Sequence, residues 1–250
     1  MKVLITGKGG VGKTTVAAIL ARTLARRGLE VTAIDGDSNP NLAIALGLGD
    51  SYRGVRSIRN EIGGKSDDHA IATLTRDFGV AGPDGVRLMQ TGEVKKPSEG
   101  CLCCGSHMTL RDVFARLESG PGHWVIADLE PGVNDVLWAY PKPGDAMVIV
   151  TDTSKKSLEV GKRLRDVAGE LNLGTVIVVA NQAERPDDVE RAAAAFPGLT
   201  ILVVPDDAGV RAADQRGESP LDAAPEAAGT LALAALADRL VSAEAGSPVS

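Results

Sequence analysis

The chain has 250 residues and a formal net charge of −6 at neutral pH, with 44% hydrophobic and 24% charged residues. These proportions are typical of a globular protein, and the acidic balance argues against a general nucleic-acid-binding surface. Only 3% of the residues are aromatic, so platforms for base stacking are not expected. Since no apolar run approaches the roughly 18 residues of a membrane-spanning helix, no membrane partner is expected either.

The chain opens with MKVLIT, which leads directly into a glycine-rich segment without the apolar core of a signal peptide. This pattern predicts a buried first strand and a cytoplasmic protein. All three cysteines lie within four positions, and such a cluster does not form a disulfide framework. A reducing compartment would keep these thiols free.

Short apolar runs alternate with helical patterns along the chain. The expected strands are residues 2–6, 30–35, 86–90, 124–128, 146–150, 175–181 and 200–204. Apolar spacing predicts a helix from Lys13 to a stop at Gly28, another from about Met108, and a third within residues 154–171. Buried strands separated by helices indicate an α/β fold with a mostly parallel central sheet and helices on both faces.

The sequence predicts one domain over residues 1–241 and a disordered tail over residues 242–250. Residues 51–84 are polar, rich in glycine and weakly periodic, which predicts a mobile insertion over one edge of the sheet. Strands that end in Asp35 and Asp128 would bring their loops together at the carboxyl edge, where such sheets bind ligands.

The segment GKGGVGKT at residues 7–14 matches the phosphate-binding pattern G-x-x-x-x-G-K-[ST], between an expected strand and an expected helix. Its backbone N–H groups and the start of the helix would face a polyphosphate, with Lys13 on the β- and γ-phosphates and Thr14 on Mg²⁺. The expected contacts to ATP or ADP are Gly9, Gly10, Val11, Gly12, Lys13, Thr14 and Thr15. We therefore predict a P-loop nucleotide site. The alternative is a glycine-rich turn without a ligand.

Lys8 is a second lysine in this loop, and it could point toward a nucleotide held by another subunit or be solvated. The segment KGGVGKT resembles the deviant Walker A motif of the SIMIBI-class ATPases, which include the nitrogenase iron protein, the MinD and ParA families and the CooC-type ATPases of nickel-enzyme maturation. The resemblance implies that Lys8 reaches the phosphates of a partner chain. It therefore implies an ATP-dependent homodimer.

Carboxylates follow two of the expected strands. Asp35 and Asp37 could divide the work around a Mg²⁺-nucleotide, with one near the metal and the other positioning the attacking water. The resemblance gives the water to Asp37, and a helix cap is the alternative for this residue. Asp128 in DLEPG has the Walker B position and would face Mg²⁺ through water, while Gly132 would follow the γ-phosphate. The expected reaction is Mg²⁺-dependent ATP hydrolysis, with Lys8, Lys13, Asp37 and Asp128 as the catalytic residues.

The resemblance also implies an adenine site near the end of the chain. It makes Asn181 a contact to the base and places Pro205, Asp206 and Asp207 beside it. A loop-capping asparagine and a Pro-Asp turn are the alternatives.

The segment EGCLCCGSHMTLR holds every cysteine of the chain. Cys101 and Cys103 form a C-x-C pair of thiols that suits Zn²⁺ or Ni²⁺ but supplies only half of a closed tetrahedral site. Two copies of the loop around a twofold axis would complete the site. Cys104 or His107 could complete it within one chain instead, and small buried hydrophobes are a further alternative.

This segment resembles the GCxC segment of CooC-type proteins, which mature the nickel-containing carbon monoxide dehydrogenase. The segments DGDSNPNLAIALG and DDAGVRAADQRGESP are also similar, so the resemblance extends over residues 1–240. It implies a metallochaperone ATPase with Zn²⁺ or Ni²⁺ on Cys101 and Cys103 at the dimer interface, and a client metalloenzyme as its partner. Cys104 departs from the family, where proline is frequent. The alternatives are a MinD/ParA-like positioning ATPase and an iron–sulfur redox ATPase.

Overall fold

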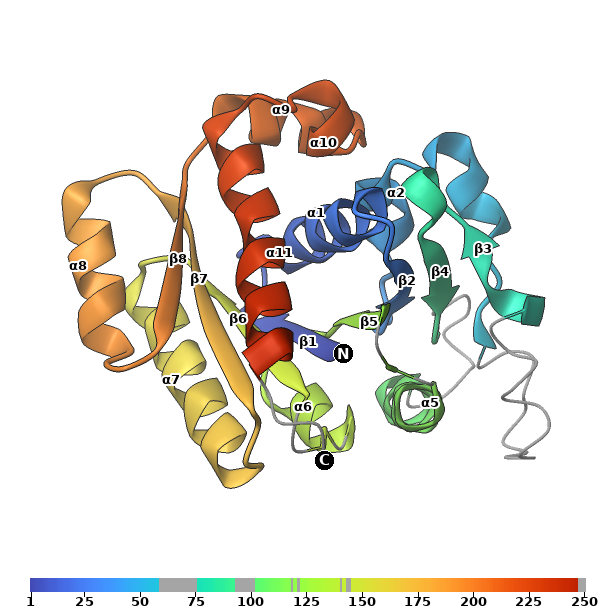
Figure 1. Cartoon of the computed structure of the whole chain (residues 1–250), viewed down its shortest axis with the longest axis horizontal. Coiled ribbons are helices and arrows are strands. Elements are labelled where there is room, and N and C mark those ends of the chain that lie inside the picture. The colour runs from blue at the N-terminus through green and yellow to red at the C-terminus, as the bar shows by residue number, and fades with distance from the viewer. Residues whose placement is uncertain are drawn as a thin grey trace.

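The computed structural model describes residues 1–58, 76–92, 102–117, 119–120, 122–139, 141–142 and 145–246. Within them, eight strands form one sheet in the order β3-β4-β2-β5-β1-β6-β7-β8 (Figure 1). The strands are β1 (Lys2–Gly7), β2 (Glu30–Asp35), β3 (Val80–Ala81), β4 (Arg87–Gln90), β5 (His123–Asp128), β6 (Ala146–Thr151), β7 (Thr175–Ala183) and β8 (Thr200–Pro205). Only β3 is antiparallel to its neighbour, so the predicted, mostly parallel α/β sheet is confirmed.

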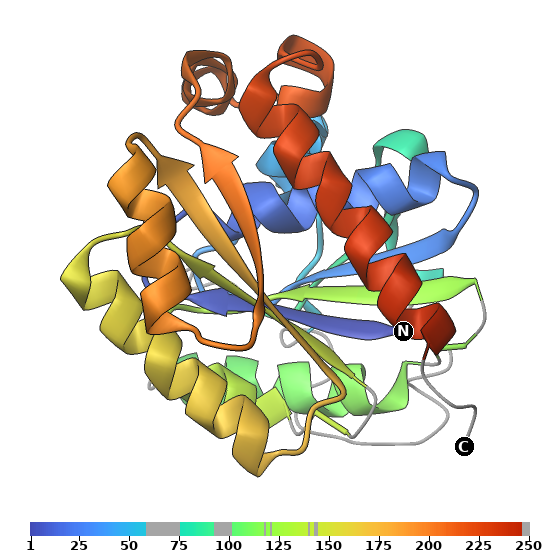
Figure 2. The same ribbon diagram turned by 60° about the vertical axis from the view of Figure 1, so that its left-hand side comes forward.

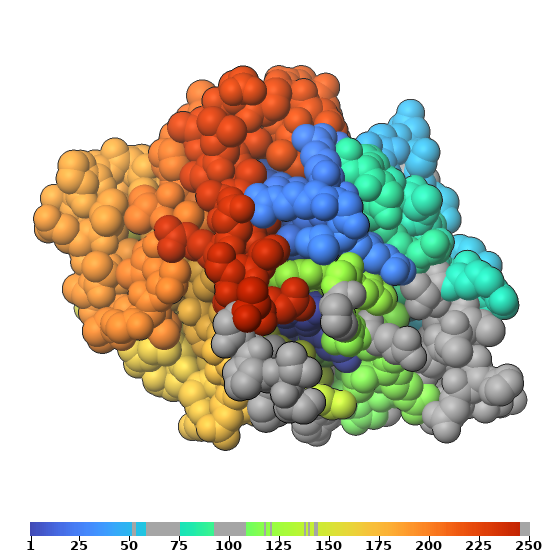
Figure 3. Space-filling model, in the orientation of Figure 1, coloured from blue at the N-terminus to red at the C-terminus, as the bar shows by residue number. Residues whose placement is uncertain are grey.

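Helices cover both faces of this sheet. They are α1 (Lys13–Arg26), α2 (Leu42–Leu46), α5 (Leu102–Arg116), α6 (Asn134–Ala139), α7 (Lys155–Glu170), α8 (Pro186–Ala195), α9 (Ala208–Arg216), α10 (Pro220–Ala223) and α11 (Ala228–Gly246), with 3₁₀ turns η1 (Gly49–Gly54) and η2 (Pro83–Gly85). Figure 2 shows α1 and α11 on one side of the sheet and α5 and α7 on the other. α11 packs along α1, and Figure 3 shows their surfaces meeting.

Alternating side chains of the strands pack into two separate hydrophobic cores, one on each face of the sheet. Val3 and Ile5 of β1 pack in the core beneath α1 and α11, whereas Leu4 packs in the core beneath α5, α6 and α7. Successive residues of a strand point to opposite faces, so burial on both faces explains why residues 3–5 of β1 are all apolar. β1 lies between β5 and β6 in parallel register, which places the loop after Gly7 at the centre of the carboxyl edge.

The C-terminal helix is longer than predicted. The expected disordered tail from residue 242 is wrong over residues 242–246, because α11 continues to Gly246. Val241 packs against the core, and the amino group of Met1 lies 3.0 Å from the carboxylate of Glu244. These contacts hold the last turns of the helix, whereas residues 247–250 lie outside the described part of the chain.

Two other boundaries differ from the predictions. α5 begins at Leu102, six residues before the predicted start at Met108. The sequence pattern did not predict these first turns because they hold cysteines and a glycine and have no apolar stripe at helical spacing. The segment predicted as a mobile insertion contains β3 and most of η1 and η2 among its described residues, and β3 pairs Val80 with Leu88 of β4. In the described part of the chain, no helix combines the length and apolar character needed to cross a membrane.

Candidate functional site

The glycine-rich loop between β1 and α1 depends on missing side chains at two points. At Gly7, with φ +153°, a Cβ atom would lie 2.1 Å from the carbonyl oxygen of Val150. At Gly12, with φ +89°, it would lie 2.6 Å from Nδ2 of Asn181. Gly12 is the N-cap of α1, so the unpaired N–H groups of the first turn of this helix face outward beside the loop. This arrangement suits an anion at the helix N-terminus.

A cavity of about 770 Å³ opens beside this loop at the carboxyl edge of the sheet. Its volume lies within the roughly 300–1,000 Å³ of small-molecule sites. Ten of the residues predicted from sequence line it: Gly10, Gly12, Lys13, Thr14, Thr15, Asp37, Asn181, Pro205, Asp206 and Asp207. The fold therefore brings together segments that are nearly 200 positions apart in the sequence. Among the other predicted residues, Val11, Asp35 and Asp128 are buried, and Gly9 is exposed on the loop.

Lys13 is a buried cation at the start of α1. Its Nζ donates to the carbonyl oxygen of Lys8 at 3.3 Å, which leaves other N–H donors for a phosphate. Burial lowers the pKa of Lys13, while the charges of Asp128, Asp37 and Asp135 act in the opposite direction. The charges of these three acids therefore favour the protonated, cationic form of Lys13, which suits the binding of a polyphosphate.

Asp35 and Asp128 end two paired strands and stand directly opposite each other in the register of β2 and β5. Burial raises the pKa of Asp35 to about 7. Burial also raises the pKa of Asp128 to about 8, with the neighbouring charge of Asp35 adding to the shift. Two carboxyl groups so close together in a low-dielectric site resist ionising at the same time.

The surroundings of Asp128 fit the predicted Mg²⁺ site. Its carboxylate accepts a hydrogen bond from the hydroxyl of Thr14. Oδ1 is buried, yet it has no hydrogen-bond partner in the described structure. Since Mg²⁺ prefers oxygen ligands and keeps several of its waters, a metal-bound water would satisfy this oxygen while Thr14 bound the ion directly.

Asp35 instead holds its own loop. One carboxylate oxygen accepts from the backbone N–H of Leu42 at 2.8 Å, and the other accepts from the N–H of Asp37 at 3.2 Å. The first residue of α2 is thereby tied to the end of β2. Since both oxygens are engaged, the contacts explain a structural role, and Mg²⁺ binding by Asp35 stays a prediction.

Asp37 faces the cavity and is half-buried. Its carboxylate accepts from the N–H of Asn39 at 2.8 Å, whereas Asn41 is the N-cap of α2. The helix-cap alternative is therefore wrong for Asp37. Burial raises its pKa, with the charge of Glu130 adding to the shift and that of Lys13 opposing it. A carboxylate at the cavity wall with a raised pKa suits the predicted role of orienting a water.

Glu130 was missed from the sequence, although it follows Asp128 by two residues in DLEPG. Its Oε1 accepts from the N–H of Ser38 at 2.9 Å, and its own N–H donates to Asp135 at 2.8 Å. Gly132 completes the connection, since its N–H donates to the carbonyl oxygen of Gly7 at 3.2 Å. The loops after β1, β2 and β5 are therefore joined by direct hydrogen bonds.

The residues predicted to contact adenine also support the scaffold. Asn181 of β7 donates to the carbonyl oxygen of Val11 at 2.8 Å and so ties β7 to the phosphate loop. Asp207 caps α9 by accepting from the N–H groups of Gly209 and Val210, and Asp206 pairs with Arg211. The structure thus gives Asp207 a helix-capping role, while contact to adenine by these residues stays a prediction.

The cysteine side chains of the predicted metal-binding segment lie outside the described structure. Cys101 is not described, and for Cys103, Cys104 and His107 only the backbone within α5 is. Within the described residues, no group of three or more histidine, cysteine or acidic side chains is placed to hold a metal ion. Lys8, which was predicted to reach a partner chain, is half-buried in the loop.

A phosphate-binding loop after the central strand, a buried lysine and an acid ending the neighbouring strand together define a P-loop ATPase that uses Mg²⁺ and ATP. The chain belongs to the CobQ/CobB/MinD/ParA nucleotide-binding family, whose model matches residues 2–221. The carbon monoxide dehydrogenase accessory protein CooC of Rhodospirillum rubrum is 29% identical over 240 residues, which cover 90% of this chain and 91% of that protein. An uncharacterized ATP-binding protein of Methanocaldococcus jannaschii is 30% identical over 199 residues, covering 75% of this chain and 77% of that protein. The septum site-determining protein MinD of Pyrococcus horikoshii, solved with Mg-ADP, superposes with a TM-score of 0.75 at 22% identity over 98% of both chains.

The raised pKa values of Asp35 and Asp128 lead us to expect that the stability of the protein falls as the pH rises. Their pKa values are raised in the folded state from 3.8 to about 7 and about 8, so between these limits the folded protein binds more protons than the unfolded chain. The free energy of unfolding of the nucleotide-free protein should therefore decrease from about pH 5 to about pH 8, by up to about 1.4 kcal/mol per pH unit for each acid. Thermal melts across this range measure the slope, and Asp128→Asn should flatten it. A melting temperature that rises with pH in the parent would contradict the assignment.

Proposed function

We propose that this chain is a maturation ATPase that dimerises with ATP and binds Zn²⁺ or Ni²⁺ through Cys101 and Cys103 at the dimer interface. Hydrolysis then supports nickel insertion into a client enzyme such as carbon monoxide dehydrogenase. The observation that carries the proposal is the similarity to a carbon monoxide dehydrogenase accessory protein over 90% of the chain, in a sequence that holds a C-x-C pair.

The packing of α5 supports a connection between the nucleotide and the cysteines. α5 begins directly after Cys101 and packs against α6, which follows the loop of Asp128. A Cβ atom at Gly36 would lie 3.3 Å from Cδ2 of Leu110 on α5. The helix that contains Cys103 therefore touches the loop after β2 and packs on the helix that follows the loop of Asp128. A shift of these loops on hydrolysis would move the start of α5 and with it the thiols.

The chemistry at the cavity follows from the same residues. Lys13 would neutralise the β- and γ-phosphates, Thr14 would hold Mg²⁺, and Asp128 would orient a water of the metal. Asp37 would position the attacking water, and Lys8 would reach the phosphates of the partner chain. Closing two chains over their nucleotides would bring two C-x-C pairs together and supply the four thiolates of a tetrahedral site.

Metal content under anaerobic conditions tests the proposal. We expect the parent with ATP to bind about one Zn²⁺ or Ni²⁺ per two chains, and Cys101→Ala/Cys103→Ala to bind none at that site. Cys104→Ala is the matched control, since it removes a thiol from the same segment, and it should bind as the parent does. If the double variant binds as much metal as the parent, the cysteine bridge is wrong. Iron with visible absorption would favour the iron–sulfur alternative.

A further inference from the structure

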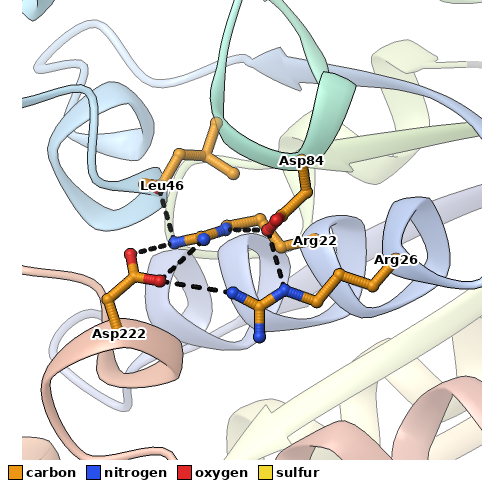
Figure 4. Close-up of polar contacts among 5 residues, drawn as sticks. All are labelled: Arg22, Arg26, Leu46, Asp84 and Asp222. Carbon is orange, nitrogen blue, oxygen red and sulfur yellow. Dashed lines mark hydrogen bonds and ion pairs between the residues drawn. The ribbon is translucent and has the colours of Figure 1, made fainter.

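A buried arginine, Arg22, lies in the C-terminal half of α1, the helix that begins at the phosphate loop. The side chain of Arg22 is only 3% exposed, and it donates to three different segments (Figure 4). Nε donates to Asp84 of η2 at 2.6 Å, and the two terminal nitrogens donate to Asp222 of α10 at 2.5 and 2.8 Å. Nη1 also donates to the carbonyl oxygen of Leu46, the last residue of α2, at 3.1 Å.

The cluster is neutral in sum. Arg26 of α1 also bonds Asp84 at 3.0 Å and Asp222 at 3.2 Å, so two arginines share two acids. Arg26 is 41% exposed, whereas Arg22 is enclosed. A buried guanidinium that loses its partner carries a large cost, so Arg22 strongly favours the arrangement in which both acids stay in place.

Of the three segments that Arg22 joins, α2 lines the cavity, and so does the turn directly before α10. α2 contributes Ile44 and Ala45 to its wall, and the turn that leads from α9 into α10 contributes Gly217 and Glu218. These two wall segments touch, because a Cβ atom at Gly217 would lie 3.3 Å from Cγ2 of Ile44. The third segment, η2, is not part of the cavity lining.

We propose that Arg22 is a positioning residue for nucleotide binding. Through Leu46 and Asp222, which lie outside the cavity lining, it holds α2 and the turn before α10 at the spacing that a bound nucleotide requires, without touching the nucleotide itself. The inference rests on this cavity being the nucleotide site and is independent of any metal on the cysteines. Because α2 starts where Asp35 ties it to β2, Arg22 also fixes the far end of the segment that carries Asp37.

The two acids provide a matched pair of variants. Asp222→Ala and Asp84→Ala each remove one carboxylate from Arg22, but only Asp222 lies on a segment that continues into the cavity wall. We expect Asp222→Ala to raise the dissociation constant for ATP, and KM, about tenfold while kcat stays within about twofold. Asp84→Ala should leave both constants within about twofold, even if its melting temperature falls as far.

Equilibrium binding of a fluorescent ATP analogue, together with steady-state hydrolysis and thermal melts, separates these outcomes. An equal loss of affinity in both variants would mean that the cluster only stabilises the fold, and it would overturn the inference. Unchanged affinity in a folded Asp222→Ala protein would overturn it as well. A parent that binds no nucleotide would instead contradict the assignment of the cavity. Because both variants retain Arg22, the test does not depend on whether a protein without this arginine folds.

Discussion

Replacing Lys13 with alanine is expected to lower kcat/KM for ATP hydrolysis by about a hundredfold to a thousandfold. Lys13 is the buried cation of the phosphate loop, and the charges of Asp128, Asp37 and Asp135 act on it. Without its charge, the negative potential of Asp37 and Asp128 would face the phosphates directly. Because Lys13 also lowers the pKa of both acids, its loss should raise their pKa values further.

Hydrolysis and ATP affinity, measured side by side, check this expectation. Lys162→Ala is a suitable control, since this lysine lies on α7 and its side chain is 38% exposed. It should hydrolyse ATP as the parent does. A Lys13→Ala protein that stays within threefold of the parent would remove the phosphate loop from the mechanism.

Asp37→Asn should lower kcat by about a hundredfold or more while the affinity for ATP changes little. The amide oxygen can still accept the hydrogen bond from Asn39, so the turn at residues 37–39 should keep its shape. What the variant loses is a carboxylate at the cavity wall that can orient or activate water. The expected result is therefore an enzyme that binds ATP and retains it.

Single-turnover hydrolysis separates the chemical step from binding for this variant. Asp166→Asn, at an exposed position on α7, provides the control and should show parent rates. Normal hydrolysis by Asp37→Asn would transfer the role to another acid of these loops, of which Glu130 is the nearest candidate by its effect on Asp37.

Much of this fold could be predicted because its sheet is buried on both faces. Runs such as KVLIT and EVTAID are mainly apolar, and the seven predicted strands all occur, with ends that differ by no more than two residues. The two-residue strand β3 was missed, since pairing with β4 rather than local sequence stabilises it. The end of α11 was missed because contacts to Met1 and the core fix it.

The residues of the candidate site also fall into those that could be predicted from the sequence and those that could not. The phosphate loop and the strand-end acids are encoded within short segments, so their positions could be predicted. Glu130 and Arg22 act through partners 92 and 200 positions away, and no local pattern shows which charges the fold will bring together. The cysteine pair was predicted as half of a site, and we propose that a second chain, which a single sequence does not show, supplies the other half.

Native mass measurement of the Asp37→Asn protein with ATP and Zn²⁺ tests the central claim most directly. This variant should retain ATP and so accumulate the closed state. We predict a dimer that holds about one metal ion. This metal-bound dimer should be absent in the Asp37→Asn/Cys101→Ala/Cys103→Ala protein. A monomer, or a dimer that holds its metal without these two cysteines, would contradict the account.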